Sequence, residues 1–318
     1  MKIIIVGPGA MGTLFATKLY NKTREEIWLF DKDNKRAEII SRNGIKINGL
    51  INIKSKPDKV HITTDPLKIG KANLIIFFVK AFDTENAARK IIPCIGENTA
   101  ILTLQNGLGN AEIIQKVIRS ATLTMNPPGY PPRRVGVKGK GLNISLRDVT
   151  ILAGTTSEGS TYNAPGFVTH TGCGETVLGY YSNTRPPQRG KLLKQIKDLF
   201  DSAGLRTSLT PNVKNQIWSK LILNSAINPL GAITLRKNGE LLKDKCLKEL
   251  LFSVVNESAE VARRCGMNLL YKDPVKKLEE VCKNTAGNYN SMLQDILKGK
   301  RTEIDYINGA IIRAAHSV

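Results

Sequence analysis

The fold of this chain is decided by its first residues, Lys2-Ile3-Ile4-Ile5-Val6-Gly7-Pro8-Gly9-Ala10-Met11-Gly12. The opening run is rich in β-branched residues, the pattern of a buried parallel strand. It leads into G-x-G-x-x-G, in which Gly7 allows a tight turn, Gly9 lets the backbone approach a pyrophosphate, and Gly12 lets the next helix pack closely. Residues 13–22 are expected to form that helix, with its N-terminus toward the phosphates. Strand, glycine turn and helix in this order predict a dinucleotide-binding α/β sheet.

The end of the next strand bears on the choice of nucleotide. Residues 27–30 form this strand, and Asp31 follows it, nineteen residues after Gly12. An acidic residue at this point would bond the ribose 2′-hydroxyl of NAD, whereas a cation would serve the 2′-phosphate of NADP. Lys32 and Arg36 are close enough in the chain for the second role. The residues therefore leave NAD and NADP both open, together with the simpler reading that Asp31 only starts a turn.

The remaining strands and helices of the first half follow from short apolar runs between turn residues. Strands are expected at 45–53, 60–63, 72–79, 100–104, 151–155, 167–170 and 177–180, and helices at 37–43 and 84–92. Residues 122–149 are rich in proline and lysine, which indicates an exposed basic loop. A linker is expected at 182–187. The first domain is accordingly predicted to span residues 1–184.

Two polar residues follow buried strands of this predicted sheet. Lys80 comes after the strand at 72–79, and Asn106 comes between the strand at 100–104 and a glycine turn. Ligands bind at the carboxyl ends of the strands in doubly wound sheets, so both residues are candidates for the active site. A solvated lysine and a turn-forming asparagine are the alternatives.

The second half, residues 185–318, changes to a helical period. Helices are expected at 192–203, 213–227, 240–265, 275–283, 292–297 and 302–315, with a short extended piece at 205–209. This domain is predicted to be all-helical.

One helix of this domain carries an unusual polar row. Lys220, Asn224 and Asn228 are spaced four apart, which places them on one face of an otherwise apolar helix. Burying such a row costs free energy unless a polar ligand lies opposite. A solvated face is the alternative reading.

Composition excludes several classes of protein. The 318 residues are 41% hydrophobic and 23% charged, which is typical of a soluble globular chain of two domains. No apolar run approaches the roughly 20 residues that span a membrane. Five scattered cysteines and three histidines show no metal-ligand spacing, so we expect reduced thiols, a cytoplasmic protein and no metal site. The net charge of +20 is spread along the chain, which favours attraction of an anionic substrate and cofactor over nucleic-acid binding.

Several blocks of sequence together resemble the ketopantoate reductase (2-dehydropantoate 2-reductase) family of pantothenate and coenzyme A biosynthesis. They are Gly7-Pro8-Gly9-Ala10-Met11-Gly12, Val79-Lys80-Ala81, Gln105-Asn106-Gly107, the row Lys220/Asn224/Asn228 with Pro229-Leu230, Ser291-Met292-Leu293-Gln294-Asp295, and Thr302-Glu303-Ile304-Asp305-Tyr306-Ile307-Asn308-Gly309. The resemblance implies an N-terminal Rossmann-type doubly wound sheet, a C-terminal all-α domain, and an active site in the cleft between them. Similar chains lack most of residues 122–149 and usually continue past Val318 through another helix.

The resemblance also implies roles for individual residues. Lys220 is similar to the family's general acid, and Glu303 to the glutamate that orients the substrate and the lysine. The implied substrate-binding residues are Lys80, Asn106, Asn224, Asn228 and Ser291. The implied cofactor-binding residues are Gly7, Pro8, Gly9, Ala10, Met11, Gly12, Asp31, Lys32, Lys80 and Asn106. NADP(H) is the family's usual cofactor, and NAD(H) stays open because of Asp31.

The same residues support ketone reduction on chemical grounds. Negative charge develops on a ketone oxygen when a hydride reaches the carbon, and an ammonium beside it stabilises that charge and then gives up a proton. Ketopantoate, with its ketone, carboxylate and hydroxyl, suits the lysine and carboxamides. Two alternatives remain: a related 2-keto or 3-hydroxy acid dehydrogenase with another substrate, and a basic nucleotide-binding protein without catalysis. The sequence does not determine the oligomeric state, and a homodimer is the assembly to test.

Overall fold

A computed structural model of the chain describes residues 1–57, 60–125, 149–181 and 189–318. These residues form two compact units. The sheet unit comprises Met1–Gln105 and Asn110–Val213, and the helical unit comprises Asn106–Gly109 and Lys214–Val318. Most of the predicted basic loop at 122–149, and the predicted linker at 182–187, lie outside the described residues. Among the helices of the described part, none is long and apolar enough to cross a membrane.

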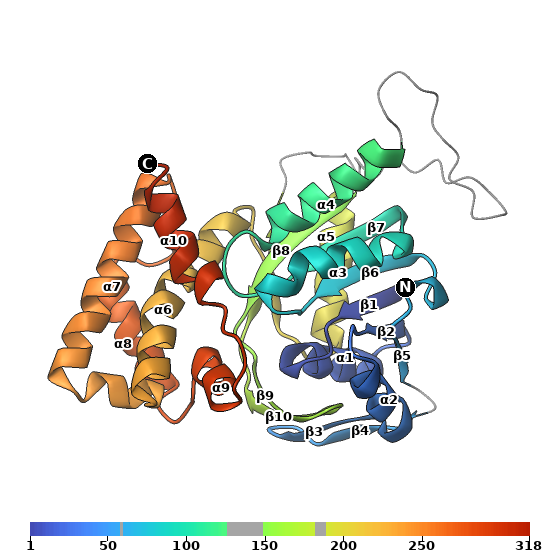
Figure 1. The fold of residues 1–318 in the computed structure, drawn as a ribbon, viewed down its shortest axis with the longest axis horizontal. Coiled ribbons are helices and arrows are strands. Elements are labelled where there is room, and N and C mark those ends of the chain that lie inside the picture. Colours follow the sequence, from blue (N-terminus) through green and yellow to red (C-terminus); the bar gives the residue numbers. More distant parts are fainter. Residues whose placement is uncertain (58–59, 126–148, 182–188) are drawn as a thin grey trace. The chain divides into compact units, whose positions relative to one another are not determined.

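The sheet unit is built on one large, mostly parallel sheet. Its strands are β1 (Lys2–Val6), β2 (Glu26–Phe30), β5 (His61–Thr63), β6 (Ala72–Phe77), β7 (Ile95–Thr103), β8 (Thr150–Thr156), β11 (Thr176–Tyr180) and β12 (Thr207–Leu209). They lie in the order β12-β11-β8-β7-β6-β1-β2-β5. The strands from β8 to β5 are labelled in Figure 1. All neighbours from β5 to β8 are parallel. The chain leaves β1 for β2 and β5, then returns to the other side of β1 as β6. That reversal is the switch point at which doubly wound sheets bind dinucleotides.

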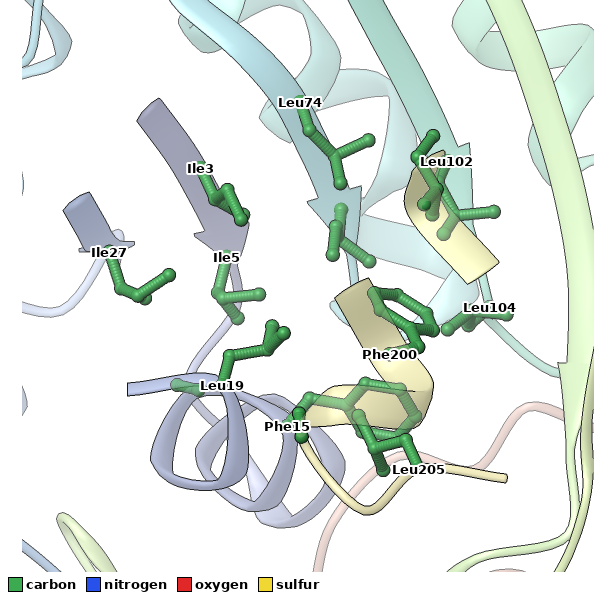
Figure 2. Packing of buried hydrophobic residues seen from close by; sticks show 14 of the residues in the cluster. Ile3, Ile5, Phe15, Leu19, Ile27, Leu74, Leu102, Leu104, Phe200 and Leu205 are labelled. Carbon is green, nitrogen blue, oxygen red and sulfur yellow. The ribbon is translucent and has the colours of Figure 1, made fainter. Parts of the chain in front are cut away.

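Helices cover both faces of this sheet. They are α1 (Ala10–Lys22), α2 (Asn34–Asn43), α3 (Thr84–Ile91), α4 (Asn110–Met125) and α5 (Arg189–Ser202). Ile3 and Ile5 point to one face and pack in a cluster with Phe15 of α1 and Phe200 of α5 (Figure 2). Ile4, between them, faces the opposite cluster with residues of α3 and α4. Because side chains alternate along a strand and both faces are covered, the buried part of β1 must be apolar on both faces, as Ile3 to Val6 are.

A smaller sheet differs from the sequence prediction. It contains β3 (Ile45–Gly49), β4 (Ile53–Ser55), β9 (Gly159–Ala164) and β10 (Phe167–Gly172), in the order β4-β3-β10-β9. The single strand predicted at 45–53 is wrong, because Gly49 adopts φ +98° and the chain turns before β4. The strand β9 was not predicted, since its residues are small and polar. It is fixed by antiparallel pairing with β10.

Several helices also depart from the prediction. Those expected at 240–265 and 302–315 are each divided, the first into Asn238–Leu242 and Lys245–Arg264, the second into Ile304–Tyr306 and Asn308–Ala315. No helix was predicted over α4, although Ile114, Val117, Ile118 and Ala121 have the spacing of a buried helix face. The helix α6 (Val213–Thr234) was predicted to end at residue 227, but it continues past Pro229.

The boundary between the units lies later than the predicted division at residues 184 and 185. After α5 the chain returns to the main sheet as β12, which pairs parallel with β11. Phe200 of α5 is fully buried in the core of the sheet unit. The extended piece predicted at 205–209 is therefore the last strand of the sheet, and the helical unit begins at Lys214.

The helical unit is built around α6. The other elements are η6 (Asn238–Leu242), α7 (Lys245–Arg264), α8 (Pro274–Asn284), α9 (Ser291–Leu297), η7 (Ile304–Tyr306) and α10 (Asn308–Ala315). Buried residues of α6, including Leu221, Ile222 and Ile227, form one cluster with residues of α7, α8, α9 and α10. A helix that is apolar nearly all round is expected at the centre of a bundle. The predicted all-helical character of this part is confirmed.

Candidate active site

The glycine turn between β1 and α1 has the geometry of a phosphate-binding loop. Gly7 adopts φ +91°, and Gly9 N donates to Gly7 O at 2.8 Å. A Cβ on Gly12 would lie 2.2 Å from Gly7 O, so only glycine permits this close approach of helix and turn. A Cβ on Gly9 would meet nothing within 4 Å, so the space beside it is open. Gly9 caps α1 without any side-chain hydrogen bond, which leaves the first N–H groups of the helix available to an anion.

Asp31 directly follows β2, and both of its carboxylate oxygens accept hydrogen bonds from nearby residues. Its carboxylate accepts two hydrogen bonds from the guanidinium of Arg36, one through each oxygen, and a third from Asp33 N at 3.1 Å. The Asp31 side chain is 1% exposed, whereas that of Arg36 is 25% exposed. The adjacent Lys32 pairs with Asp83 at 2.7 Å. Arg36 is thus held in place by Asp31 and is partly exposed, whereas Lys32, whose side chain is 52% exposed, is the more solvent-facing cation beside this strand end.

The ends of β6 and β7 are tied together by a residue that the sequence did not single out for a role. Gln105 donates from Nε2 to Val79 O at 2.8 Å and to Thr84 Oγ1 at 2.7 Å. Lys80 directly follows Val79, and Asn106 directly follows Gln105. The prediction that strand ends carry both residues is thus confirmed, and Gln105 links the two strand ends.

The polar row on α6 is confirmed as one helix face. Asn228 is buried, and Lys220 and Asn224 are half-buried, within a helix whose other residues form the core. Burial lowers the pKa of the Lys220 ammonium to about 8, and the charge of the Glu303 carboxylate offsets part of that change. At neutral pH this group is still protonated, yet it gives up its proton more readily than an exposed lysine.

Glu303 lies just before η7, beside the short segment of the first half that belongs to the helical unit. Its side chain is 6% exposed, so the carboxylate is buried. Three residues on, Tyr306 O accepts from Leu108 N at 2.9 Å. Gly107 has φ +85°, and a Cβ there would lie 2.5 Å from Tyr306 O. The glycine after Asn106 is therefore needed for this close backbone contact, which holds Asn106 in the same unit as Lys220 and Glu303.

Pro229 explains how α6 is attached to the segment that carries Glu303. Proline has no N–H, so the carbonyl of Ser225, four residues earlier, lacks its helical donor. Asn308 Nδ2 supplies that donor at 2.9 Å. No role was predicted for Asn308. The signal in the sequence was Pro229, because a proline inside a helix leaves the carbonyl four residues earlier in need of a donor from outside the helix.

Asn290 makes the second attachment to α6. Its Nδ2 donates to Ile227 O at 3.3 Å, and its Oδ1 caps α9 by accepting from Leu293 N at 2.9 Å. A Cβ on Gly231 would lie 2.2 Å from that Nδ2, so the glycine makes room for it. Ser291, predicted to bind substrate, follows Asn290 at the start of α9 and is exposed. Asn290 was not predicted as a site residue.

The predicted site residues divide between the units. The helical unit holds Asn106, Lys220, Asn224, Asn228, Ser291 and Glu303, and the sheet unit holds the glycine turn, Asp31, Lys32 and Lys80. A doubly wound sheet whose glycine turn has the geometry of phosphate-binding loops, and a helix presenting an ammonium of lowered pKa among carboxamides, are the features of an NAD(P)-dependent oxidoreductase acting on CH–OH groups.

Comparison with known proteins identifies the family. A family model described as ketopantoate reductase PanE/ApbA matches residues 3–183, and its C-terminal counterpart matches residues 212–318. The chain belongs to the ketopantoate reductase family. A 2-dehydropantoate 2-reductase of Pyrococcus horikoshii is 35% identical over 321 positions, covering 100% of this chain and 92% of the relative. One from Pyrococcus abyssi is 34% identical with the same coverage.

Solved structures show the same fold. A ternary complex of D-mandelate dehydrogenase with NADH and anilino(oxo)acetate has a TM-score of 0.82 at 27% identity, covering 100% of this chain and 92% of the other. A PanE/ApbA family ketopantoate reductase from Ralstonia eutropha has a TM-score of 0.79 at 27% identity with the same coverage.

Proposed function

We propose that this protein reduces the ketone of ketopantoate to the alcohol of pantoate, with Lys220 as the general acid. The observation that carries the proposal is the burial of Lys220 on α6, which lowers its pKa to about 8 within reach of the charge of Glu303. A general acid works best when its pKa lies near the working pH. The curated relatives named 2-dehydropantoate 2-reductase support the choice of substrate.

The proposed chemistry assigns one task to each group. A bound reduced nicotinamide supplies a hydride for the ketone carbon. The ammonium of Lys220 stabilises the negative charge that develops on the oxygen and donates a proton to it, and the neutral amine then regains a proton from solvent. Glu303 holds the ammonium and accepts a hydrogen bond from the substrate hydroxyl. Asn106, Asn224, Asn228, Ser291 and Lys80 bind the remaining oxygens.

The sheet unit fits a dinucleotide. The open space beside Gly9 and the uncapped N-terminus of α1 suit a pyrophosphate, because helix N-termini present N–H groups and positive partial charge. We assign this turn, from Gly7 to Gly12, to the pyrophosphate. No side chain within it carries a charge, so the backbone supplies the binding groups.

We further propose a preference for NADP(H). Both oxygens of Asp31 already accept from Arg36 and the carboxylate is buried, which argues against the role of Asp31 as the acceptor for a ribose hydroxyl of NAD. A planar guanidinium held in a fixed orientation by a carboxylate suits a phosphate, since guanidinium N–H groups match the spacing of phosphate oxygens. Lys32 then acts as a secondary cation that is shared with Asp83.

A second candidate substrate class comes from the fold comparison. The D-mandelate dehydrogenase complex binds NADH and anilino(oxo)acetate, and the match covers 100% of this chain and 92% of that one. The same acid and carboxamides could therefore serve a bulkier 2-keto acid, with NADH as the cofactor. Ketopantoate is favoured because relatives named for it have the higher identity, at 34–35% against 27%.

The test is consumption of the reduced nicotinamide with ketopantoate, measured with NADPH and NADH in parallel. Efficient turnover with NADPH is expected. A screen of branched and aromatic 2-keto acids separates the two candidates: a higher kcat/KM for an aromatic substrate would reject ketopantoate. Absence of turnover on every keto acid, in protein that binds NADPH, would reject the reductase assignment. The predicted homodimer is checked by light scattering on the same preparation.

A further inference from the structure

A second group of polar side chains is buried in the sheet unit. Glu158 precedes β9, His170 lies in β10, and Cys173 follows that strand. Lys18 of α1 lies against Glu158. Lys18 is eight residues from Ala10 at the start of α1, or about 12 Å along the helix axis, so this group is not part of the phosphate-binding turn. Neither ketone reduction nor dinucleotide binding, as described above, uses any of the four.

The three donor groups converge on one point. His170 Nε2 lies 2.6 Å from Glu158 Oε2 and 3.8 Å from Cys173 Sγ. All three donor atoms lie within 4.8 Å of one another. The side chains of His170 and Glu158 are 0% and 2% exposed, whereas Cys173 is exposed and opens the group to solvent. The other ring nitrogen of His170, Nδ1, is buried and has no hydrogen-bond partner among the described residues. Among the described residues, the ring therefore has polar partners at Nε2 alone.

We propose that Glu158, His170 and Cys173 form a zinc-binding site. Thiolate, imidazole and carboxylate are the ligand types that zinc takes in proteins, and exposure at Cys173 provides an entry path and a fourth position for water. Binding takes the lone pair of His170 Nε2, so the ring proton now shared with Glu158 moves to Nδ1, and the metal replaces the proton of the Cys173 thiol, which is released to solvent.

The distances are close to those of a tetrahedral site. Zinc bonds of about 2.3 Å to sulfur and about 2.0 Å to nitrogen, at a tetrahedral angle, separate the two donors by about 3.5 Å. The observed separation of His170 Nε2 and Cys173 Sγ is 3.8 Å. The Glu158 oxygen needs to withdraw from the ring by less than about 1 Å to make room for a metal in place of the present hydrogen bond.

Lys18 shares the carboxylate with the proposed metal. Its Nζ lies 3.2 Å from each oxygen of Glu158 and 3.3 Å from Gly204 O. In the metal-bound site Lys18 stays hydrogen-bonded to Oε1 of Glu158, and zinc coordinates Oε2. The ammonium orients the carboxylate and weakens cation binding by repulsion, so we expect an affinity below that of a site without it. A purely structural ion pair is the competing reading, and it predicts no metal binding.

The experiment is a titration of metal-free, full-length protein with Co²⁺ alone, which gives visible absorption when bound tetrahedrally and a separate charge-transfer band when a thiolate is a ligand. We expect a charge-transfer band that saturates at one Co²⁺ per chain and is abolished by Zn²⁺. Cys173→Ser should remove the band and weaken Co²⁺ binding beyond the roughly 10–100-fold typical of losing a supporting residue. Because Cys173 is exposed, this variant should fold normally.

Matched variants separate a built site from a reactive surface thiol. Cys246→Ser changes another exposed cysteine, in the helical unit, and should leave the titration unchanged. His170→Gln, checked for folding by thermal unfolding, should weaken Co²⁺ binding as Cys173→Ser does. The proposal is overturned if wild-type protein shows no charge-transfer band, if the band survives Cys173→Ser, or if folded His170→Gln binds Co²⁺ with unchanged affinity.

Discussion

The two units build their sites from different material. In the sheet unit the phosphate-binding turn is backbone: Gly7 and Gly12 bring turn and helix together, and Gly9 leaves space beside α1. In the helical unit the proposed catalytic groups are side chains on a buried helix, supported by Asn308 and Asn290 at carbonyls of α6. A backbone site is sensitive to any added Cβ, whereas a side-chain site is sensitive to loss of one functional group. The two kinds of mutation should therefore have separable effects.

The largest expected effect is the loss of Lys220. Lys220→Ala should lower kcat by roughly 10²–10⁴-fold, the usual contribution of a general acid, because no other group is assigned to protonate the developing oxyanion. The dissociation constant for NADPH should not change, since the sheet unit is untouched. Steady-state kinetics and a nucleotide titration measure both. Lys214→Ala, at an exposed position of the same helix, is the matched control. A loss below tenfold in folded protein would remove Lys220 from the role of acid.

A substitution of Arg36 tests the principal charged contact proposed between the sheet unit and the cofactor. Arg36→Ala should raise KM for NADPH by roughly 10- to 100-fold, the value of one or two hydrogen bonds to a charged group, and leave KM for NADH nearly unchanged. Arg42→Ala changes an exposed arginine of the same helix and should affect neither cofactor. Equal losses for NADPH and NADH would show that Arg36 supports the fold rather than the 2′-phosphate.

Two alanine substitutions divide the glycine turn into its structural and binding parts. Gly12→Ala puts a Cβ 2.2 Å from Gly7 O and should destabilise the protein by about 1–3 kcal/mol, as overpacking does. Gly9→Ala meets open space and should keep the free energy of unfolding within about 1 kcal/mol while weakening the dinucleotide. Chemical denaturation and an NADPH titration separate the outcomes. If Gly9→Ala bound NADPH as tightly as wild type, the pyrophosphate would not lie beside Gly9.

The attachment of α6 through Asn308 can be isolated by a double-mutant cycle. Asn308→Ala should destabilise the helical unit by about 1–3 kcal/mol, because the buried carbonyl of Ser225 loses its only identified donor. Pro229→Ala restores a backbone N–H four residues after Ser225, so Asn308→Ala should cost less in that background. Equal costs in both backgrounds, from denaturation curves, would show that the carbonyl of Ser225 is not the reason for Asn308.

The smallest expected effect is a change in pH dependence. The acid must be protonated, so kcat/KM for ketone reduction should fall above about pH 8, the pKa of Lys220. The carboxylate of Glu303 raises that pKa, so Glu303→Gln should move the descending limb to lower pH. Asp305→Asn removes an exposed carboxylate two residues away and should leave the limb in place. An unmoved limb in Glu303→Gln would show that Glu303 does not act on Lys220 through its charge.

Much of the fold and of the candidate site was readable from the sequence, for local reasons. The run from Lys2 to Gly12 predicted its own structure, because glycine is the residue that permits the positive φ at Gly7 and the close approach of helix and turn at Gly12. The spacing of Lys220, Asn224 and Asn228 fixes their common face through the period of the helix alone. Two of the errors arose because the signal was not local: β9 is a strand through its pairing with β10, and β12 joins the sheet across a whole helix.

The tertiary structure decided which polar groups meet, both between neighbouring elements and between segments far apart in the chain. Asp31 reads as a ribose acceptor in the sequence, and it is the fold of α2 that places Arg36 on both of its oxygens. The donors to α6, Asn290 and Asn308, are recognised only once the carbonyls they reach are known. Histidine and cysteine spacing along the chain predicted no metal site. The fold nevertheless brings together Glu158 before β9, His170 within β10 and Cys173 directly after β10. Sequence determines what each short segment can form, because backbone geometry and helical period act locally. Only packing determines which polar groups meet, because burial obliges each of them to find a partner wherever the chain supplies one.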